Sequence, residues 1–292
     1  MLLTGQWLPD NYYQIAYTAP GMQPNLQASG INQLLLSKGL IAAFGRYEAD
    51  VIQAIKRQAP QLMSGVFAFD LWNEQSFGAK DLPFSKTSGT FSDDFGRTYD
   101  LSSPLARQAL ADDATMEWVN GVTSAIKKVE PELLITSSVF TLLEVRRTGY
   151  NGVYTSGSAW GDWRQPFRLK TLESSNIDFL QLHPYPHSRD YRMEPDLDSV
   201  EFSQLRRTKP ILIGEFGARK KDFQTIGDVP VVAKNYLSQA CRHGFSGWLF
   251  WTWDTYQQER KDDLWNMTDN GDLLARDLSP KVLDWCDSTK RP

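Results

Sequence analysis

Two glutamates stand at the ends of apolar segments that are typical of buried strands. Glu74 follows Asn73 in "FAFDLWNEQ", and Glu215 lies near the end of "PILIGEF". A carboxylate is costly to bury unless it is paired or used in chemistry. Side chains alternate along a strand, so Ile211, Ile213 and Glu215 share one face and Glu215 lies at its polar tip. Two such carboxylates brought together could act as an acid/base and a nucleophile.

Hydrolysis of a glycosidic bond needs such a pair. One carboxylic acid protonates the leaving oxygen, and the other carboxylate attacks the anomeric carbon or activates water. Asn73 would then hydrogen-bond the 2-hydroxyl of the sugar, an interaction that strengthens in the transition state. Adjacent residues of a regular strand face opposite ways, so Asn73 and Glu74 reach one substrate only if the strand ends or bulges there.

Short apolar segments alternate with helical patterns along the chain, which predicts a parallel sheet with helices outside it. The strands are nearly all apolar, as expected where both faces of a sheet are buried. The expected strands lie near 2–8, 65–72, 132–140, 178–183, 210–216 and 246–253, and the expected helices over 48–59, 104–130, 168–175, 196–208, 229–243 and 279–288.

Two closures of such a sheet compete. A doubly wound nucleotide-binding sheet would have a glycine-rich turn after its first strand, and neither G-x-G-x-x-G nor G-x-x-x-x-G-K-[ST] occurs. Polar and aromatic residues gather instead at the carboxyl ends of several strands, where a (β/α)8 TIM barrel builds its active site. We therefore expect an α/β fold of the TIM-barrel type, formed by residues 1–292 as a single catalytic domain.

Four segments in order carry a resemblance to a known family. "DLWNE", "LHPYP", "IGEFG" and "FWTW" resemble strands four, six, seven and eight of the clan A glycoside hydrolases, and most closely the cellulase-like family 5. The resemblance covers about residues 60–285. It implies a retaining (β/α)8-barrel enzyme that cleaves a β-linked glucan or mannan and needs no metal or organic cofactor.

The resemblance also assigns roles to individual residues. By position, Glu74 matches the acid/base and Glu215 the nucleophile of the family, and Tyr185 matches the residue that orients the nucleophile. The remaining residues expected to bind substrate are Asn73, His183, Trp251, Trp253 and Trp7.

Other polar and aromatic residues have more ordinary interpretations. Trp160 and Trp163 lie on a long loop above the expected barrel mouth and could contact substrate or pack within the loop. Asp70 is expected to be a buried structural group. A lone disulfide between Cys241 and Cys286 cannot be deduced from two cysteines.

The chain departs from the family pattern in two places. Gln75 stands where the family has proline after the acid/base. The start, "MLLTGQWLP", resembles strand three, so strands one and two, and the arginine that strand two usually carries, lack a counterpart. Two explanations stay open: an N-terminally shortened barrel, or a segment, residues 9–46, that partly fills the gap.

Composition disfavours several other functions. The formal net charge is −4 and no Lys/Arg block occurs, which disfavours nucleic-acid and anionic-membrane partners. No run approaches the roughly 18 apolar residues of a membrane span. The first residues lack the basic region of a signal peptide, and both a secreted and a cytoplasmic location stay open. Pro184 and Pro186 separate His183 from His187, so these two cannot form a helical metal pair.

The favoured interpretation is therefore a retaining glycoside hydrolase whose partner is an oligo- or polysaccharide. The alternative is an inactive or glycan-binding remnant of an incomplete barrel. A metal-dependent barrel hydrolase is a third hypothesis, disfavoured because the chain has only 3 histidines.

Overall fold

The computed structural model describes residues 2–3, 8–18, 23–25, 27–153, 161–255, 263–279 and 286 of the chain. Its contacts group into two compact units. Unit 1 comprises Met1–Leu180 and Asp198–Lys209, and unit 2 comprises Gln181–Leu197 and Pro210–Pro292. The single domain expected over residues 1–292 stays a prediction.

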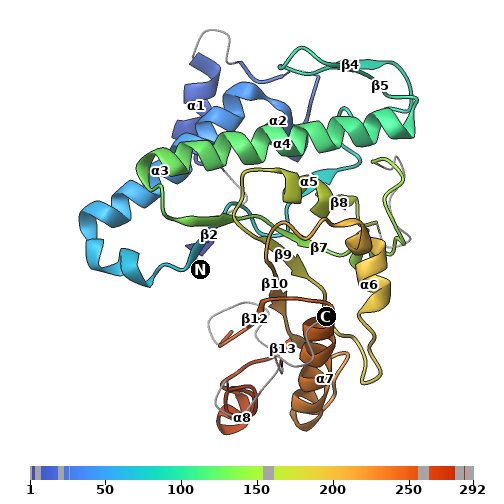
Figure 1. Cartoon of the computed structure of the whole chain (residues 1–292). Coiled ribbons are helices and arrows are strands. Elements are labelled where there is room, and N and C mark those ends of the chain that lie inside the picture. Colours follow the sequence, from blue (N-terminus) through green and yellow to red (C-terminus); the bar gives the residue numbers. More distant parts are fainter. Residues whose placement is uncertain are drawn as a thin grey trace. The chain divides into compact units, whose positions relative to one another are not determined.

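Unit 1 contains short parallel strands and long helices (Figure 1). Its elements in chain order are β1 (Leu2–Leu3), α1 (Asp10–Thr18), α2 (Gly30–Leu36), α3 (Lys38–Gln58), η1 (Pro60–Gly65), β2 (Ala68–Asp70), β3 (Ser76–Gly78), β4 (Thr90–Ser92), β5 (Thr98–Asp100), α4 (Pro104–Val129), β6 (Leu134–Thr136), β7 (Ser138–Phe140), η2 (Leu142–Val145), β8 (Arg164–Pro166), α5 (Leu169–Ser174) and η3 (Phe202–Gln204).

The parallel sheet of unit 1 has the order β1-β2-β6. Asp70 of β2 lies opposite Leu3 of β1 and opposite Thr136 of β6. The long helices α3 and α4 lie side by side (Figure 1). The buried rings of Phe44 on α3, Trp72 after β2 and Trp118 on α4 contact one another, with ring centroids 5.2–5.8 Å apart. Trp72 thus belongs to the core that supports the end of β2.

The helix signals of this part of the sequence are confirmed. The Ser103 hydroxyl accepts the backbone N–H of Ala106 at 3.2 Å, so it caps α4 at its first turn. Pro104 occupies the first turn, where its missing N–H is harmless. Helix α3 ends at Gln58, two residues before Pro60, although it begins ten residues earlier than the pattern over 48–59 indicated.

The segment 9–46 does not supply a further strand where the structure describes it. Its described residues form α1, α2 and the first part of α3, and the described part of this segment contains no strand. Leu34, Leu35 and Leu36 are buried within helix α2, so this apolar run is helical and not a strand.

Two other expectations were wrong. The helix expected over 196–208 is instead α6 (Glu194–Ser199), followed by η3. The chain leaves the helix because Glu201 adopts φ +56°, and its carboxylate is held by the Arg168 guanidinium at 2.5 Å. The polar segment 75–103, expected to be a loop, contains β3 and the antiparallel pair β4–β5.

Unit 2 repeats the alternation of strand and helix. Its further elements are β9 (Leu180–His183), which begins at the last residue of unit 1's first segment, β10 (Ile211–Phe216), β11 (Ala218–Arg219), η4 (Ile226–Asp228), α7 (Val229–Arg242), β12 (Gly247–Phe250), β13 (Leu264–Trp265) and α8 (Asp269–Asp277). Strands β9, β10 and β12 are neighbours in that order, and β10 pairs with β12 in parallel. Apart from Ser279 and Cys286, the helix expected over 279–288 lies outside the described residues.

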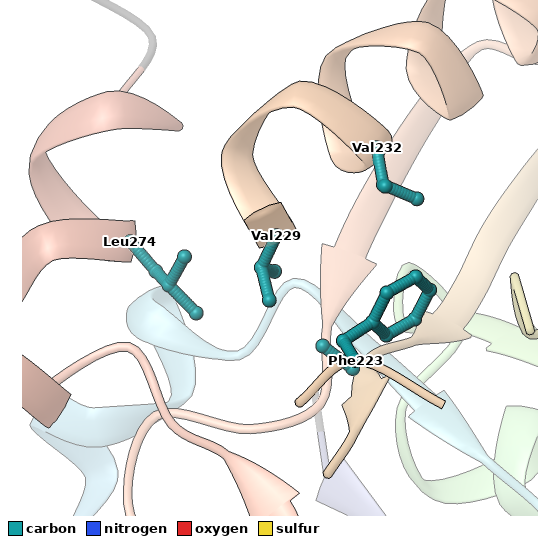
Figure 2. Close-up of a cluster of buried hydrophobic side chains, with 5 residues drawn as sticks. Phe223, Val229, Val232 and Leu274 are labelled. Carbon is teal, nitrogen blue, oxygen red and sulfur yellow. The ribbon is translucent and has the colours of Figure 1, made fainter. Parts of the chain in front are cut away.

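Unit 2 contains a small cluster of buried apolar residues. Figure 2 shows Val229 at the start of α7 and Leu274 of α8 pointing toward one another, with Phe223 near Val232. All four are buried, together with Ala218. The cluster fixes α7 and α8 against β11, the strand that follows Glu215.

These elements make an α/β fold with parallel strands, a partial (β/α)8 barrel, as the sequence predicted. Of the helices among the described residues, none is both long enough and apolar enough to cross a membrane.

The disulfide left open by the sequence is present in unit 2. Cys241 of α7 is bonded to Cys286, 45 residues further along the chain. A cross-link of this length restricts the unfolded chain and typically stabilises a domain by about 2–4 kcal/mol. We expect the Cys241→Ser/Cys286→Ser double variant to lose about that much free energy of unfolding in urea.

Dithiothreitol supplies the control for this prediction. Reduction should destabilise the wild-type protein by a similar amount and leave the double variant unchanged. Equal unfolding midpoints for the oxidised wild type and the variant would contradict it.

Candidate functional site

Glu74 lies in a turn that follows directly on strand β2. The strand ends at Asp70, and the chain bends through Leu71 and Trp72. Glu74 itself adopts φ +54°, in the left-handed region that non-glycine residues rarely occupy. The strand therefore ends before Asn73, which meets the condition under which both Asn73 and Glu74 can face one substrate.

Ser138 fixes this turn through four hydrogen bonds. Its N–H donates to Asp70 Oδ1 at 3.2 Å and its hydroxyl donates to the carbonyl of Trp72 at 3.3 Å. The same hydroxyl accepts the N–H of Glu74 at 3.1 Å, and the Ser138 carbonyl accepts the N–H of Gln75 at 3.0 Å. Ser138 thus bonds the backbone of Trp72, Glu74 and Gln75 and the carboxylate of Asp70, which holds Glu74 in its strained conformation.

Asp70 and Gln75 are structural parts of the turn. The Asp70 carboxylate is 1% exposed and accepts backbone N–H groups, as expected for a buried structural group. The side chain of Gln75 is buried, and its Oε1 accepts the hydroxyl of Ser137 at 2.8 Å. This glutamine fixes the turn by a hydrogen bond of its side chain.

The carboxylate of Glu74 contacts an arginine from a distant segment. Arg164 Nη1 of β8 lies 3.3 Å from Glu74 Oε2, and Arg164 Nη2 lies 3.0 Å from Asp162 Oδ2. The guanidinium also lies 4.4 Å above the ring of Phe140. Burial raises the pKa of Asp162, but hydrogen bonds from Arg164 and its charge outweigh burial and hold that pKa below its usual value. One guanidinium is therefore shared between two carboxylates.

Glu215 lies near the end of β10 in unit 2, beside two residues that follow or end β9. The hydroxyl of Tyr185 donates to Glu215 Oε1, and His183 Nδ1 lies 3.7 Å from Glu215 Oε2. His183 and Tyr185 are both buried. The sequence predicted these three residues to lie together, and unit 2 brings them together. An imidazole and a carboxylate this close could also share a cation, which makes a chelator a necessary control.

Close packing around Glu215 explains the two glycines of "IGEFG". A Cβ at Gly214 would lie 2.1 Å from Gln181 Oε1 and 2.9 Å from His183 Nε2. A Cβ at Gly217 would lie 2.2 Å from the carbonyl oxygen of Trp251. The strands on either side of β10 thus approach the backbone next to Glu215 as closely as glycine allows.

Helix α7 and strand β11 hold Tyr185 from two directions. The buried hydroxyl of Tyr236 on α7 donates to the carbonyl of Pro184 at 2.6 Å, and its ring stacks on Phe216. Arg219 of β11 places its guanidinium 4.8 Å from the centre of the Tyr185 ring, a cation–π contact. Tyr185 is therefore fixed next to Glu215 and faces a positive charge.

The tryptophans singled out from the sequence differ in how exposed they are, and two of them lie outside the described residues. Trp251 is 37% exposed and Trp253 is 64% exposed, so both present ring surface to solvent within unit 2. The N–H of Trp251 donates to the carbonyl of Phe216 at 2.7 Å. Trp7 and Trp160 lie outside the described residues, whereas Trp163 is half-buried beside β8.

The sequence did not indicate the residues that contact the two carboxylates from other segments. Arg164 lies 90 residues from Glu74, and no local pattern connects them. Ser138 lies 64 residues from Glu74 within an apolar strand. Arg219 could have been found more easily, because it follows Glu215 by only four residues and lies on the next strand of the chain, β11.

Comparison with known proteins places the fold among glycoside hydrolases of solved structure. No protein-family model and no curated protein sequence matches the chain. An endo-1,4-beta-D-mannanase from Thermotoga petrophila RKU-1 matches with a TM-score of 0.57 and 14% identity, over 97% of this chain and 74% of its own. This likeness shows the fold.

Two further structures match with lower TM-scores. The endo-1,4-beta-mannanase from Rhizomucor miehei gives a TM-score of 0.48 at 15% identity, over 93% of this chain and 67% of its own. The exo-beta-1,4-mannosidase from Opitutaceae bacterium strain TAV5 gives 0.45 at 20% identity, over 75% of this chain. The chain spans 33% of that mannosidase's length.

Ser138 provides a test of how the Glu74 turn is held. Replacement by alanine removes the hydroxyl that bonds both Trp72 and Glu74 and leaves two backbone groups without it. We expect Ser138→Ala to lower the free energy of unfolding by about 1–3 kcal/mol, measured by urea denaturation.

Ser64→Ala is the matched control, because the exposed hydroxyl of Ser64 bonds locally, to the carbonyl of Gln61 in the same short helix. We expect that change to stay within about 0.5 kcal/mol. Equal effects of the two substitutions would show that the Ser138 contacts do not stabilise the turn.

Proposed function

We propose that this chain is a retaining glycoside hydrolase, of the cellulase-like family 5 type, acting on a β-linked glucan or mannan. One observation carries the proposal: two strands of a partial (β/α)8 barrel are each followed or ended by a glutamate held by specific partners. Glu74 is held in the turn after β2, and Glu215 is held near the end of β10. The carboxyl ends of strands are where barrels of this type carry their active sites.

In the first step Glu215 is the nucleophile. One of its oxygens bonds to the anomeric carbon as the bond from that carbon to the leaving oxygen breaks. Glu74, protonated, gives its proton to the leaving oxygen, so the leaving sugar departs as a neutral alcohol. Glu215 is then joined to the glycone through an ester, and Glu74 is ionised.

In the second step the same two residues reverse their roles. Ionised Glu74 takes a proton from water, and the water oxygen bonds to the anomeric carbon. The ester bond to Glu215 breaks, which releases the sugar with its original anomeric configuration and restores both carboxyl groups. Neither step needs a cofactor.

The groups that contact Glu215 suit a nucleophile that later becomes the leaving group, when water cleaves the glycosyl ester. The Tyr185 hydroxyl donates to one carboxylate oxygen, so it stabilises the negative charge that returns to Glu215 when the ester breaks. The Arg219 guanidinium over the Tyr185 ring favours this polarisation of the hydroxyl. Both act on Glu215 by positioning and charge.

The partners of Glu74 fit a group that must gain and lose a proton. A guanidinium alone would favour the ionised carboxylate. Asp162 shares Arg164, and this compensating charge reduces the effect of Arg164 on Glu74. Asn73, next to Glu74 and outside the strand, is proposed to bond the 2-hydroxyl. Trp251 and Trp253 are proposed to present ring surface to the sugar.

The substrate class is supported by the fold and by the absence of a strongly charged composition. The Thermotoga petrophila structure that shares the fold is named as an endo-1,4-beta-D-mannanase. A neutral β-1,4-linked glycan suits a chain with a formal net charge of only −4. We therefore propose β-mannan and β-glucan oligosaccharides as the first substrates to test.

A glycan-binding protein without turnover is the second candidate. The exposure of Trp251 and Trp253 favours it, because exposed indole rings bind sugars without any chemistry. Binding of mannotriose or cellotriose by a wild-type protein that hydrolyses no β-glycan would favour this candidate over the first.

Glu215→Gln tests the nucleophile. The amide is nearly the same size and cannot form the glycosyl ester, so we expect kcat to fall by about 10³-fold or more with an unchanged unfolding midpoint. Activity would be measured on chromogenic β-mannosides and β-glucosides, with and without a chelator.

Glu132→Gln is the control, since Glu132 is exposed in a turn of unit 1. Full activity of Glu215→Gln would contradict the assignment. Activity of the wild type that a chelator abolishes would contradict a metal-free mechanism.

Glu74→Gln tests the acid/base through the leaving group. The variant cannot protonate the leaving oxygen, so we expect a large loss on substrates with alkoxide leaving groups. A 2,4-dinitrophenyl glycoside needs no proton, so formation of its glycosyl-enzyme should proceed at close to the wild-type rate, seen as a burst of dinitrophenolate. An equal loss in this first step for both leaving groups would rule out the role of Glu74.

A further inference from the structure

Two exposed tryptophans of unit 2 lie on a segment without regular secondary structure. Trp251 and Trp253 follow strand β12, and residues 251–255 belong to no helix or strand. We call residues 251–255 the tryptophan segment. An exposed ring binds a sugar face well only if it is ordered before the sugar arrives, because ordering a side chain or a loop on binding costs affinity. The contacts of this segment therefore decide how well its rings are preorganised.

One end of the tryptophan segment is held against strand β10. The N–H of Trp251 donates to the carbonyl of Phe216 at 2.7 Å, and Phe216 directly follows Glu215. A Cβ at Gly217 would lie 2.2 Å from the carbonyl oxygen of Trp251, so the two backbones are in direct contact here. Trp251 is thereby placed next to the strand that carries the proposed nucleophile.

The middle of the tryptophan segment is held by the residues that follow strand β13. The N–H of Met267 donates to the carbonyl of Thr252 at 3.0 Å, and the N–H of Thr268 donates to the carbonyl of Trp253 at 3.3 Å. The Thr268 hydroxyl donates to the same carbonyl, also at 3.3 Å. These three bonds fix the backbone of Thr252 and Trp253.

A buried pair of side chains holds the far end of the tryptophan segment. The hydroxyl of Thr255 donates to Oδ1 of Asn266 at 3.0 Å, and the two residues are 1% and 4% exposed. Such a bond is costly to break, because removal of one partner leaves a buried polar group unsatisfied. The N–H of Asn266 donates in turn to Oδ2 of Asp269 at 2.9 Å, which fixes Asn266 beside the start of α8.

The residues that hold the segment are themselves connected to the strand after Glu215. Strand β13 directly precedes Asn266 and pairs with β11, so that Trp265 lies opposite Ala218. The indole N–H of Trp265 donates to the carbonyl of Phe223 at 2.7 Å. Both ends of the tryptophan segment therefore lead back to β10 and β11, and the segment shares its support with Glu215.

We propose that Thr255 and Asn266 are positioning residues for a sugar-binding surface formed by Trp251 and Trp253. Both side chains are too buried to touch a ligand, so they act on a glycan only through the tryptophan segment. Loss of their hydrogen bond releases the end of the segment next to Trp253, and the indole ring must then be ordered when the glycan binds. The sugar as ligand in this inference rests on the function proposed above.

The test compares Thr255→Val with Thr255→Ser. Valine keeps the shape of threonine without its hydroxyl, whereas serine keeps the hydroxyl. Binding of mannotriose and cellotriose would be measured by calorimetric titration in Glu215→Gln protein, which prevents turnover during the measurement. We expect Thr255→Val to raise Kd by about fivefold and Thr255→Ser to change it by less than about twofold.

A double-mutant cycle with Trp253→Ala separates positioning from general destabilisation. If Thr255 acts through the ring of Trp253, Thr255→Val has no further effect on Kd once the ring is absent. Ligand-observed NMR would give Kd where binding is too weak for calorimetry. An equal loss with and without the ring of Trp253, or a Kd unchanged by Thr255→Val, would overturn the proposal.

Thr90→Val is the control, because Thr90 is an exposed threonine of β4 in unit 1. If Thr255→Val does not fold, Thr268→Val is measured in its place. That change removes the hydroxyl that bonds to Trp253 and keeps the backbone bond to the same carbonyl. A Kd unchanged by Thr268→Val would then overturn the proposal.

The binding measurements also separate this inference from the proposed function. A wild type that hydrolyses no β-glycan, but binds a trisaccharide in the manner described, would contradict the proposed function and support the inference. A protein that binds neither trisaccharide would overturn the inference, even if it cleaves an activated aryl glycoside.

Discussion

The hydrogen bonds between Ser138 and the segment from Asp70 to Gln75 are the constraint on which the Glu74 side of the site depends. A turn must satisfy its buried backbone groups, and here Ser138 alone bonds three of them and also the carboxylate of Asp70. Because the turn is held in this way, Glu74 can occupy a left-handed conformation and Trp72 can stay in the core between α3 and α4. The same turn leads directly into β3, and through β8 it brings Arg164 to the carboxylate.

The two glutamates have environments of different kinds, and this difference fits the two roles that we propose for them. Glu74 contacts a guanidinium that it shares with Asp162, so its local charge is balanced. Glu215 contacts a phenol and an imidazole, both buried, and lies on a strand packed too closely for any side chain at Gly214. Pairs of carboxyl groups with contrasting environments are how enzymes assign acid and nucleophile roles to chemically similar residues.

The sequence predicted those features that depend on local patterns. Apolar runs located the parallel strands, and Ser103 and Pro104 located the start of α4, because capping is a local interaction. The family resemblance, rather than any pattern of spacing, led us to expect His183 and Tyr185 beside Glu215; unit 2 has the three side chains next to one another, and their roles stay predictions. Features that depend on distant contacts were not predicted: Glu201, which follows the short helix α6, pairs with Arg168, and the pairing of β3 with β8 joins segments about 88 residues apart. Arg164 could not be associated with Glu74 for the same reason.

The proposed mechanism requires that Glu215 form a covalent bond to the anomeric carbon of the sugar. A 2-deoxy-2-fluoro glycoside with a dinitrophenyl leaving group slows the breakdown of such an ester more than it prevents its formation, so the intermediate accumulates. After incubation, proteolysis and mass spectrometry would locate the added mass. We expect one fluoroglycosyl group on the peptide that contains Glu215, and none in Glu215→Gln. An active enzyme that carries the label on another residue, or that turns over the reagent with inversion of configuration, would contradict it.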